Sequence, residues 1–187
     1  MKLRFFLVCL VCMSTSVSAA DKEGQTEPLG HGYTRQGEFI YFDGQRIDQA
    51  GREDFARFTR VLGYSPKMCV KLDATSFKAL SVEYTKDKNM VYYRWISPGK
   101  FWVVEVDEAD AASFEVIGFN LARDKNNVWW YGRILPGADP ATTQIVHEGY
   151  VWKDKNKVWY QHQPIVAADP KTFRHAGAGY YIDAKGA

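Results

Sequence analysis

One short motif recurs along the chain and constrains its fold more than any other feature: Asp-Lys-Asn, one variable residue, valine and two aromatic residues. Clear copies stand at 87–93, 124–130 and 154–160, and a shortened copy begins at Tyr180. Aspartate and asparagine initiate turns through their own side chains, whereas valine and aromatic residues favour strands. Each copy therefore predicts a β-hairpin that turns at the aspartate.

A second motif follows the hairpin and has Ala-Asp-Pro-Lys-Thr-Phe at 168–173 as its clearest copy. Related segments begin at Asp73, Asp110 and Asp139. Aspartate is a good N-cap and proline suits the first helical position, so we predict a short helix at each of these places. The phenylalanine that ends three of the copies is expected in the core: Phe77, Phe114 and Phe173.

Together the two motifs define a repeat unit of roughly 30 residues, a period that is typical of repeat architectures. The units are expected to start near residues 33, 62, 84, 121, 150 and 180. A hairpin with one helical turn cannot bury its apolar face alone, whereas stacked neighbours supply the missing surface. We therefore predict a β-rich (α+β) fold in which tandem β-hairpin plus short-helix repeats stack into one domain. Both faces of each hairpin are apolar, so either both are covered or one is an exposed aromatic row.

The beginning of the chain has the pattern of a secretory signal peptide. A basic start precedes an apolar run at 5–13, and small residues stand at 18–20. The apolar run is too short to span a membrane. We therefore expect residues 1–20 to be removed on export to the periplasm, leaving a flexible lead at 21–32 and a repeat domain at 33–187.

Removal of the signal peptide would leave a chain without net charge. Loss of Lys2 and Arg4 lowers Lys plus Arg from 24 to 22, which equals the 22 Asp plus Glu. A neutral chain has no strong field for nucleic acid, and no later apolar run could span a bilayer, so we expect neither partner. Cys69 would remain alone, which excludes an intramolecular disulfide and indicates a small buried thiol.

The sequence carries no recognisable catalytic or metal-ligating signature. The Asp-Lys-Asn turns place oxygen-bearing side chains at alternate positions, as a calcium-binding loop does. However, the lysine between them disfavours a bound cation, and the glutamate that ends a calcium-binding loop is missing. The four histidines, His31, His147, His162 and His175, lack zinc-ligand spacing. Nucleophile and phosphate-loop motifs are missing as well. We therefore expect no metal, no cofactor and no enzymatic activity, while a carboxylate pair assembled in space stays open as an alternative.

The unit that starts near residue 84 is longer than the others, and its excess lies within 94–108. Insertions into a repeat array usually project from one face, often the binding face. Most tryptophans are expected in the core, whereas Trp102, in this insertion, is the best candidate for an exposed anchor. Aromatic anchors among charged residues suit a protein interface. The predicted partner-binding residues are Trp95, Lys100, Phe101, Trp102 and Glu105.

The repeated Asp-Lys-Asn-x-Val-Tyr/Trp-Tyr/Trp stretch, with its Ala-Asp-Pro-x-Thr/Ser-Phe tail, resembles the bacterial DKNYY family. The resemblance covers roughly residues 72–185, and the first two units depart from the pattern. It implies an envelope or secreted bacterial protein built from β-rich repeats, and it brings no catalytic residue and no assigned reaction. Proteins of this general kind are associated with immunity roles beside secreted toxins, which is a family-level analogy.

The leading interpretation is a non-enzymatic exported protein that binds a protein partner. A specific version is an immunity protein that neutralises a secreted toxin. Exposed aromatic rings also stack on sugars, so a cell-wall or carbohydrate-binding module is the first alternative. A hydrolase with a spatially assembled carboxylate pair is the second alternative. The sequence leaves the identity of the partner and the oligomeric state open.

Overall fold

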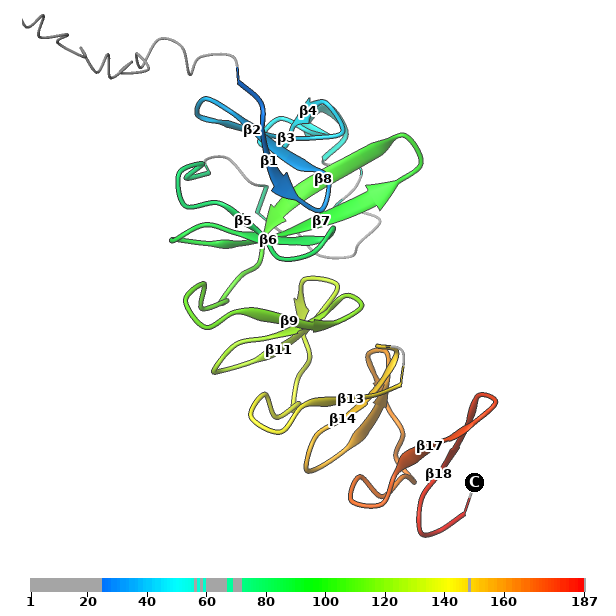
Figure 1. Ribbon diagram of the computed structural model, residues 1–187. Coiled ribbons are helices and arrows are strands. Elements are labelled where there is room, and N and C mark those ends of the chain that lie inside the picture. The colour runs from blue at the N-terminus through cyan, green and yellow to red at the C-terminus, as the bar shows by residue number, and fades with distance from the viewer. Residues whose placement is uncertain are drawn as a thin grey trace, which may run out of the picture.

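The computed structural model describes residues 25–55, 57, 59, 67–68, 72–147 and 149–186. In this part of the chain the strands form four antiparallel sheets of four strands and one sheet of two strands. Figure 1 shows the sheets following one another in chain order along a curved row. The predicted signal peptide, the unit start at Leu62 and the thiol of Cys69 lie outside the described residues.

Each four-stranded sheet is a meander in which consecutive strands pair. The first sheet contains β1 (Glu27–Gly30), β2 (Tyr33–Gln36), β3 (Phe39–Phe42) and β4 (Gln45–Arg46), and the 3-10 helix η2 (Arg52–Asp54) follows it. The second contains β5 (Lys78–Ala79), β6 (Tyr84–Lys86), β7 (Val91–Ser97) and β8 (Lys100–Glu105). The third contains β9 (Glu115–Gly118), β10 (Leu121–Arg123), β11 (Val128–Trp130) and β12 (Arg133–Ile134). The fourth contains β13 (Gln144–His147), β14 (Val151–Lys153), β15 (Val158–Tyr160) and β16 (Gln163–Pro164). The fifth contains β17 (Arg174–Gly177) and β18 (Tyr180–Ile182).

The first strand lies in the segment 21–32, which the sequence predicted to be a flexible lead. β1 pairs with β2, with Glu27 opposite Arg35, and these two side chains also form an ion pair. Leu29 packs against the core of the first two sheets. The ordered structure therefore begins before Tyr33, because pairing and apolar packing hold this part of the lead in place.

The hairpin turns lie where the sequence predicts them, at Asp87, Asp124 and Asp154, and all three are built in the same way. Each aspartate is buried. Its Oδ1 accepts the backbone N–H groups of the residues two and three positions later, at 2.6–2.9 Å. Asp183 accepts the N–H of Lys185 in the same way at 2.7 Å. The prediction of a hairpin at each of the three motifs is confirmed.

The second oxygen of each turn aspartate reaches back to the segment that precedes its sheet. There Oδ2 accepts the backbone N–H of the aspartate that opens this segment. Four such bonds of 2.6–3.0 Å join the pairs Asp87–Asp73, Asp124–Asp110, Asp154–Asp139 and Asp183–Asp169. We call each pair an aspartate clasp, because one carboxylate ties a hairpin turn to the beginning of its own sheet.

The short helices predicted at Asp73, Asp110, Asp139 and Asp169 are wrong, since each of these segments forms a single β-turn. The N–H of the residue three positions later donates to the carbonyl oxygen of each aspartate at 3.2–3.4 Å. The first three aspartates also cap that N–H through their side chains, as at a helix start. The helix does not continue because the next residue buries its side chain and leads into a strand, and one turn alone is a poor helix nucleus.

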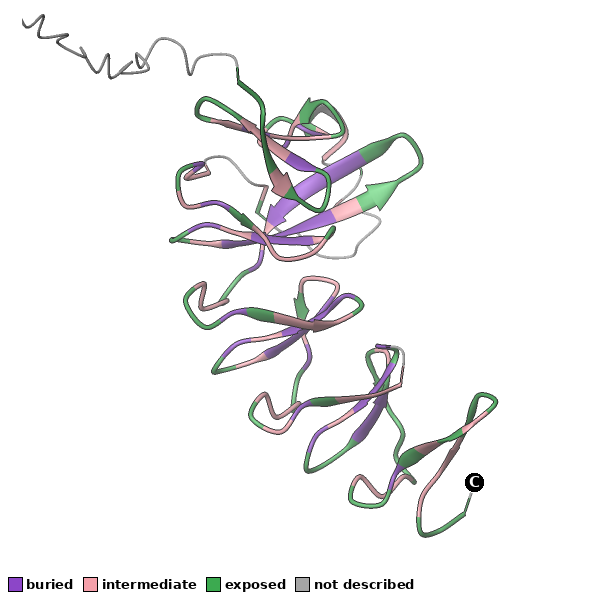
Figure 2. Ribbon diagram, in the orientation of Figure 1, coloured by how far each residue is buried: buried purple, intermediate pink, exposed green. Residues whose placement is uncertain are grey.

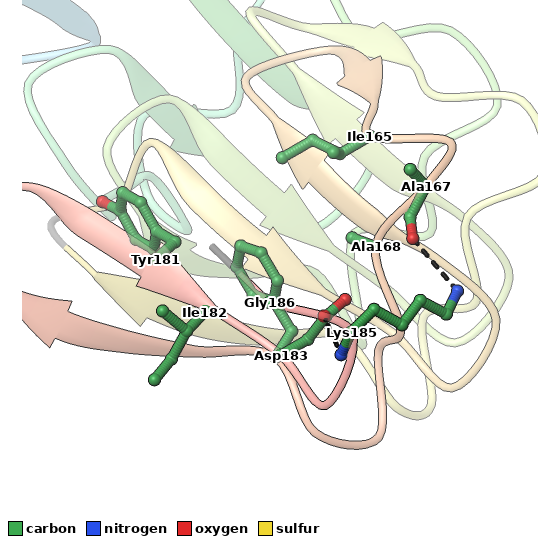
Figure 3. A pocket seen from close by; sticks show the side chains of 9 residues that line it. Ile165, Ala167, Ala168, Tyr181, Ile182, Asp183, Lys185 and Gly186 are labelled. Atoms are coloured by element: carbon green, nitrogen blue, oxygen red, sulfur yellow. Dashed lines mark hydrogen bonds between the residues drawn. The ribbon is translucent and has the colours of Figure 1, made fainter.

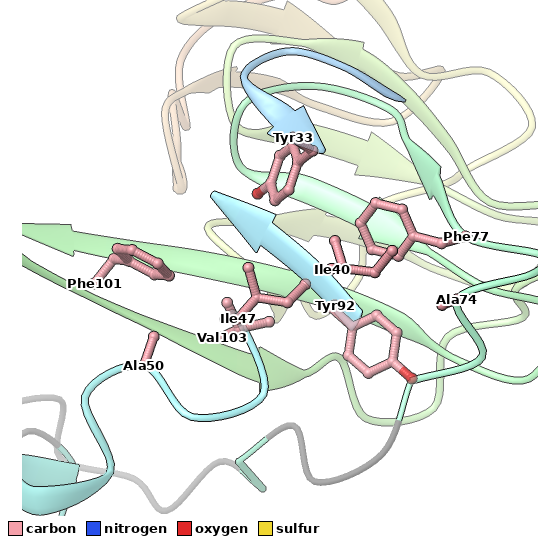
Figure 4. Close-up of a cluster of buried hydrophobic side chains, with 9 residues drawn as sticks. All are labelled: Tyr33, Ile40, Ile47, Ala50, Ala74, Phe77, Tyr92, Phe101 and Val103. Carbon is pink, nitrogen blue, oxygen red and sulfur yellow. The ribbon is translucent and has the colours of Figure 1, made fainter. Parts of the chain in front are cut away.

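Apolar clusters lie between consecutive sheets and cover both faces of the middle sheets. Figure 4 shows the cluster between the first two sheets, where Tyr33 and Ile40 meet Phe77 and Tyr92. Further clusters join the second sheet to the third, the third to the fourth and the fourth to the fifth. The buried residues accordingly lie mainly in the strands of the second to fourth sheets (Figure 2). Of the two possibilities that the sequence left open, the second to fourth sheets have both faces covered.

Basic side chains add a polar link between consecutive units. Lys86, the last residue of β6, donates from Nζ to the backbone oxygens of Ala111 at 2.7 Å and Phe114 at 3.1 Å. Arg123, at the same position of β10, donates from Nη1 to Pro140 O and Thr143 O at 3.0 and 3.1 Å. The carbonyl groups of the segments at Asp110 and Asp139 are therefore held by the hairpin of the sheet before each of them.

The three phenylalanines expected in the core are buried, which confirms that prediction: Phe77, Phe114 and Phe173 are 7%, 3% and 7% exposed. Phe114 lies between two other rings. Its centroid is 5.4 Å from that of Tyr84 in the second sheet and 5.3 Å from that of Trp129 in the third. This side chain therefore joins two sheets.

Phe114→Ala is expected to lower the free energy of unfolding by about 3–5 kcal/mol, because it removes a buried ring and leaves a cavity between two sheets. Denaturant titration of the purified protein measures this loss. Phe119→Ala is the matched control, since that ring is 46% exposed. Equal losses in the two variants would contradict the packing described above.

Candidate functional site

The predicted partner-binding residues lie on the long hairpin of β7 and β8, where two of the aromatic rings are packed inside the protein. Trp102 is 8% exposed, and its indole Nε1 donates to the backbone oxygen of Gly51 at 2.9 Å. Gly51 has a φ of 68°, and a Cβ there would lie 2.3 Å from the indole ring. Phe101 is buried edge-on against Phe42, with ring centroids 5.6 Å apart. The expectation that Trp102 is exposed is wrong, because the segment after the first sheet covers it.

The other three predicted residues are more accessible. Lys100 forms an ion pair with Asp54 of η2. Trp95 is half-buried, with its ring centroid 5.9 Å from that of Tyr131. Glu105 is half-buried as well, and burial raises the pKa of its carboxyl. The structure does not gather the five residues into one exposed surface, and their role in partner binding stays a prediction.

Exposed apolar side chains gather instead along one edge of the row of sheets. This edge carries the loops from first to second strand and from third to fourth strand of each meander, and it lies opposite the aspartate turns (Figure 2). We call the two sides the loop edge and the turn edge. The exposed large apolar residues of the loop edge are Val82, Ile96, Phe119, Tyr150, Tyr160 and Tyr180. Two other exposed large apolar residues of the described part of the chain, Ile165 and Val166, lie away from the loop edge.

Phe119 and Tyr150 form a contact at the centre of the loop edge. Their ring centroids are 5.4 Å apart, although one residue follows β9 in the third sheet and the other precedes β14 in the fourth. Gly149 makes this approach possible: it has a φ of 73°, and a Cβ there would lie 2.8 Å from the backbone nitrogen of Phe119. Close backbone packing therefore holds two exposed rings side by side.

Buried hydrogen bonds support the loop edge from within. Asn120 is buried with a left-handed φ of 54°. Its Oδ1 accepts the hydroxyl of Tyr93 at 2.6 Å, and its backbone oxygen accepts the hydroxyl of Tyr84 at 3.2 Å. The Tyr84 hydroxyl in turn accepts the N–H of Gly132 at 2.9 Å. Burial raises the pKa of Tyr93, which keeps that phenol protonated as a donor. This network fixes the loops of the third sheet.

The turn edge carries charged side chains. The lysine of each Asp-Lys-Asn motif pairs with the aspartate that opens the preceding segment, at 2.5–2.6 Å, in Lys88–Asp73, Lys125–Asp110 and Lys155–Asp139. In all three pairs the hydrogen bond from lysine is the largest cause that lowers the pKa of the aspartate carboxyl. These carboxylates also accept bonds from a neighbouring hydroxyl and from backbone N–H groups. They are thus suited to a structural role, because a general acid needs a raised pKa.

Two histidines meet where the fourth and fifth sheets adjoin. The rings of His147 and His175 stack with centroids 3.6 Å apart, and His147 Nδ1 lies 3.0 Å from the hydroxyl of Tyr181. Parallel stacked imidazoles cannot direct their in-plane lone pairs at one ion. Within the part of the chain that the structure describes, no three His, Cys, Asp or Glu side chains come together as a metal site. No helix of that part is both long and apolar enough to cross a membrane.

The model of the DKNYY family matches residues 38–163. The chain belongs to the DKNYY family. The match runs from the second hairpin strand of the first sheet into the last strand of the fourth, and it confirms the resemblance that the repeated motifs carried. No curated protein and no solved structure matches this DKNYY protein. Its Asp-Lys-Asn motifs build the turn edge and the clasps, whereas the exposed rings lie on the loop edge.

Sequence reasoning missed the loop edge of this DKNYY protein. The sequence does contain a signal for this edge. Phe119 and Tyr150 are large aromatic residues that each follow a glycine in a short loop, where small and polar residues are usual. Phe119 lies outside the repeated motifs, whereas Tyr150 stands at a predicted unit start. Their contact could not be predicted, since it depends on how closely the third and fourth sheets approach one another.

The ion pairs of the turn edge are expected to give this DKNYY protein a pH-dependent stability. A lowered aspartate pKa contributes stability that is complete above the ordinary value of about 3.9 and is lost as the pH falls below it. The triple variant Lys88→Gln, Lys125→Gln, Lys155→Gln lacks the part of this contribution that the lysines make. Its melting temperature should lie below that of the wild type at pH 7, and the difference should shrink at pH 2. Circular dichroism measures both, and a difference that stays constant with pH would contradict the assignment.

Proposed function

We propose that this DKNYY protein is an exported, non-enzymatic protein that binds a protein partner through its loop edge. The observation that carries the proposal is the row of exposed rings, with Phe119, Tyr150, Tyr160 and Tyr180 in consecutive units of one scaffold. Exposed apolar groups gathered on one side of a protein mark interaction sites more often than scattered ones do. Aromatic residues also dominate the binding energy of protein interfaces.

The rigidity of the loop edge supports this function. Phe119 and Tyr150 are held by the close approach at Gly149, and the adjoining loops are held by the buried network around Asn120. A surface whose side chains are already ordered loses less entropy when a partner binds. Tyrosine and phenylalanine add to this advantage, because they bury much area with few rotatable bonds.

The use of the carboxylates favours binding over catalysis. The clasps bring aspartates together in pairs, in which the carboxylate of one aspartate accepts the backbone N–H of the other. Those oxygens already accept hydrogen bonds within the fold. A hydrolase would need one carboxyl held protonated beside a second that is free to react.

We also propose that the sheets form one stacked repeat array, secreted to the periplasm by the signal peptide. A specific version of the function is immunity, in which the loop edge covers the active site of a secreted toxin. The extended row of rings suits this role, since several consecutive units can contact one partner. A toxin encoded beside this gene, and neutralised by this protein in a co-expression assay, would support that version.

Site-specific photocrosslinking tests the proposal. A photoreactive phenylalanine analogue replaces Tyr150 on the loop edge, or Lys125 on the turn edge as the matched control, in the protein expressed in its own host. We expect Tyr150 to give one defined protein adduct and Lys125 to give none. The double variant Phe119→Ser, Tyr150→Ser should weaken binding of the captured partner by about tenfold or more, because two anchors are lost.

Two outcomes would count against a protein partner at the loop edge. One is an adduct pattern that is the same from both edges. The other is retention of the protein on peptidoglycan that disappears in the Phe119→Ser, Tyr150→Ser variant. The second outcome would favour the cell-wall module, whose basis is that exposed tyrosine rings also stack on sugars.

A further inference from the structure

Two histidines meet between the fourth and fifth sheets, whereas the equivalent contact between the third and fourth sheets is uncharged. His147 in β13 and His175 in β17 stack with ring centroids 3.6 Å apart and an interplanar angle of 16°. By strand register the equivalent residues are Gly118 in β9 and Ile145 in β13. Those two residues also meet, since a Cβ on Gly118 would lie 2.8 Å from Ile145 Cδ1. One of two equivalent interfaces therefore carries a pair of titratable rings.

The ring of His147 can hold a proton while the interface stays packed. Its Nδ1 lies 3.0 Å from the hydroxyl of Tyr181. A tyrosine hydroxyl can donate to a neutral imidazole and accept from a protonated one, so this bond is compatible with both states. Figure 3 shows the ring of Tyr181, which stacks on that of Phe173 with centroids 5.7 Å apart. The packed interface can therefore accommodate one proton on the pair.

The surroundings of His175 oppose a second proton. In the part of the chain that the structure describes, Nε2 of His175 is buried and has no hydrogen-bond partner. A neutral imidazole can leave this nitrogen without a hydrogen, whereas an imidazolium carries an N–H on both nitrogens. Protonation of His175 would bury a donor without an acceptor and would place a second positive charge against a protonated His147. Both costs disappear when the rings separate and water reaches them.

Other titratable groups lie on the strands that pack against the two rings: Glu115, Lys153, Arg174, Tyr180 and Tyr181. Lys153 is engaged, since its Nζ donates to the backbone oxygen of Phe173 at 2.9 Å. Arg174 is exposed and adds positive charge beside the pair. Glu115 forms an ion pair within its own sheet. Glu148 follows β13 directly in the sequence, so a substitution is needed to separate its effect from that of the pair.

We propose that the stacked histidines form a pH-sensitive contact, which holds the fifth sheet against the fourth at neutral pH and releases it when a second proton enters the pair. The open arrangement binds more protons than the packed one, so acidification shifts the equilibrium toward opening. Imidazole side chains ordinarily gain their proton between pH 8 and pH 5, a range in which aspartates stay charged. The contact therefore responds to mild acid while the aspartate clasps persist.

Release of the fifth sheet would alter the loop edge at two places. Tyr180, which is 69% exposed, stands on β18 directly before the residue that bonds to His147. His147 itself ends the strand that leads to Gly149, whose close approach to Phe119 holds the exposed ring of Tyr150. Mild acid would thus weaken the binding of a protein partner at the loop edge. This consequence rests on the proposed function, whereas the opening itself does not.

Amide hydrogen exchange of the full chain at pH 7.5 and pH 5 tests the opening, with protection expressed relative to the intrinsic rate at each pH. An isolated two-stranded hairpin is marginally stable, so release of the fifth sheet should expose its ladder amides. We expect protection of residues 174–182 to be about tenfold or more lower at pH 5, because one additional proton in the open state shifts the equilibrium by up to tenfold per pH unit. Residues 115–123 of the third sheet are the internal control and should change little.

Three variants locate the sensor. His175→Ile introduces the residue type of Ile145, which stands at the equivalent position of the preceding interface. This variant should lose the pH dependence of residues 174–182. His162→Gln changes an exposed histidine of the loop edge and should retain it. Glu148→Gln should retain it as well, because the pair itself takes up the proton.

Equal protection of residues 174–182 at the two pH values, or an equal fall in both segments of the wild type, would overturn the proposal. So would a pH dependence that survives in His175→Ile or disappears in either of the other two variants. The comparison of the two wild-type segments decides the matter if His175→Ile does not fold. Hydrogen exchange needs no partner, so a failure here leaves the crosslink from Tyr150 unaffected, and failure of that crosslink leaves the exchange result unaffected.

Discussion

The buried carboxylate of the hairpin turns at Asp87, Asp124 and Asp154 is the interaction on which the rest of the structure depends. Asp124 shows the arrangement in full: its two oxygens accept the N–H groups of Asn126 and Asn127 in its own turn and of Asp110 at the start of its sheet. Hydrogen bonds to a charged acceptor are stronger than neutral ones, and a buried donor left without a partner is costly. One carboxylate therefore determines both the shape of a turn and the place where its sheet begins.

Repetition of this clasp explains why the two edges of the protein differ. The turn edge is occupied by clasps, by lysine–aspartate pairs and by basic side chains such as Lys86 that hold the next unit. Its side chains are engaged within the fold. The loop edge has no such repeated requirement, so rings such as Phe119 and Tyr150 can stay exposed while the backbone beneath them is fixed. The proposed binding surface lies where the fold leaves side chains free.

Much of this fold could be predicted from local chemistry, because the clasp residues stand close together in the sequence. The turns at Asp87, Asp124 and Asp154 and the burial of Phe114 follow from short motifs. The segment at Asp110 was harder, since an aspartate cap starts a helix and a β-turn in the same way, and burial of the next residue decides between them. Trp102 and the loop edge could not be placed, because their exposure depends on contacts with distant segments.

The most direct test of this account is the stability of Asp124→Asn compared with that of the wild type. The amide has nearly the same shape, but it keeps one acceptor oxygen and turns an N–H donor toward backbone donors. We expect a loss of unfolding free energy of roughly 2–4 kcal/mol in denaturant titration, because at least one buried N–H loses its charged acceptor. Lys125→Gln, which removes an exposed ion pair next to the same turn, should have a much smaller effect. An Asp124→Asn protein as stable as the wild type would contradict the central role of the clasp.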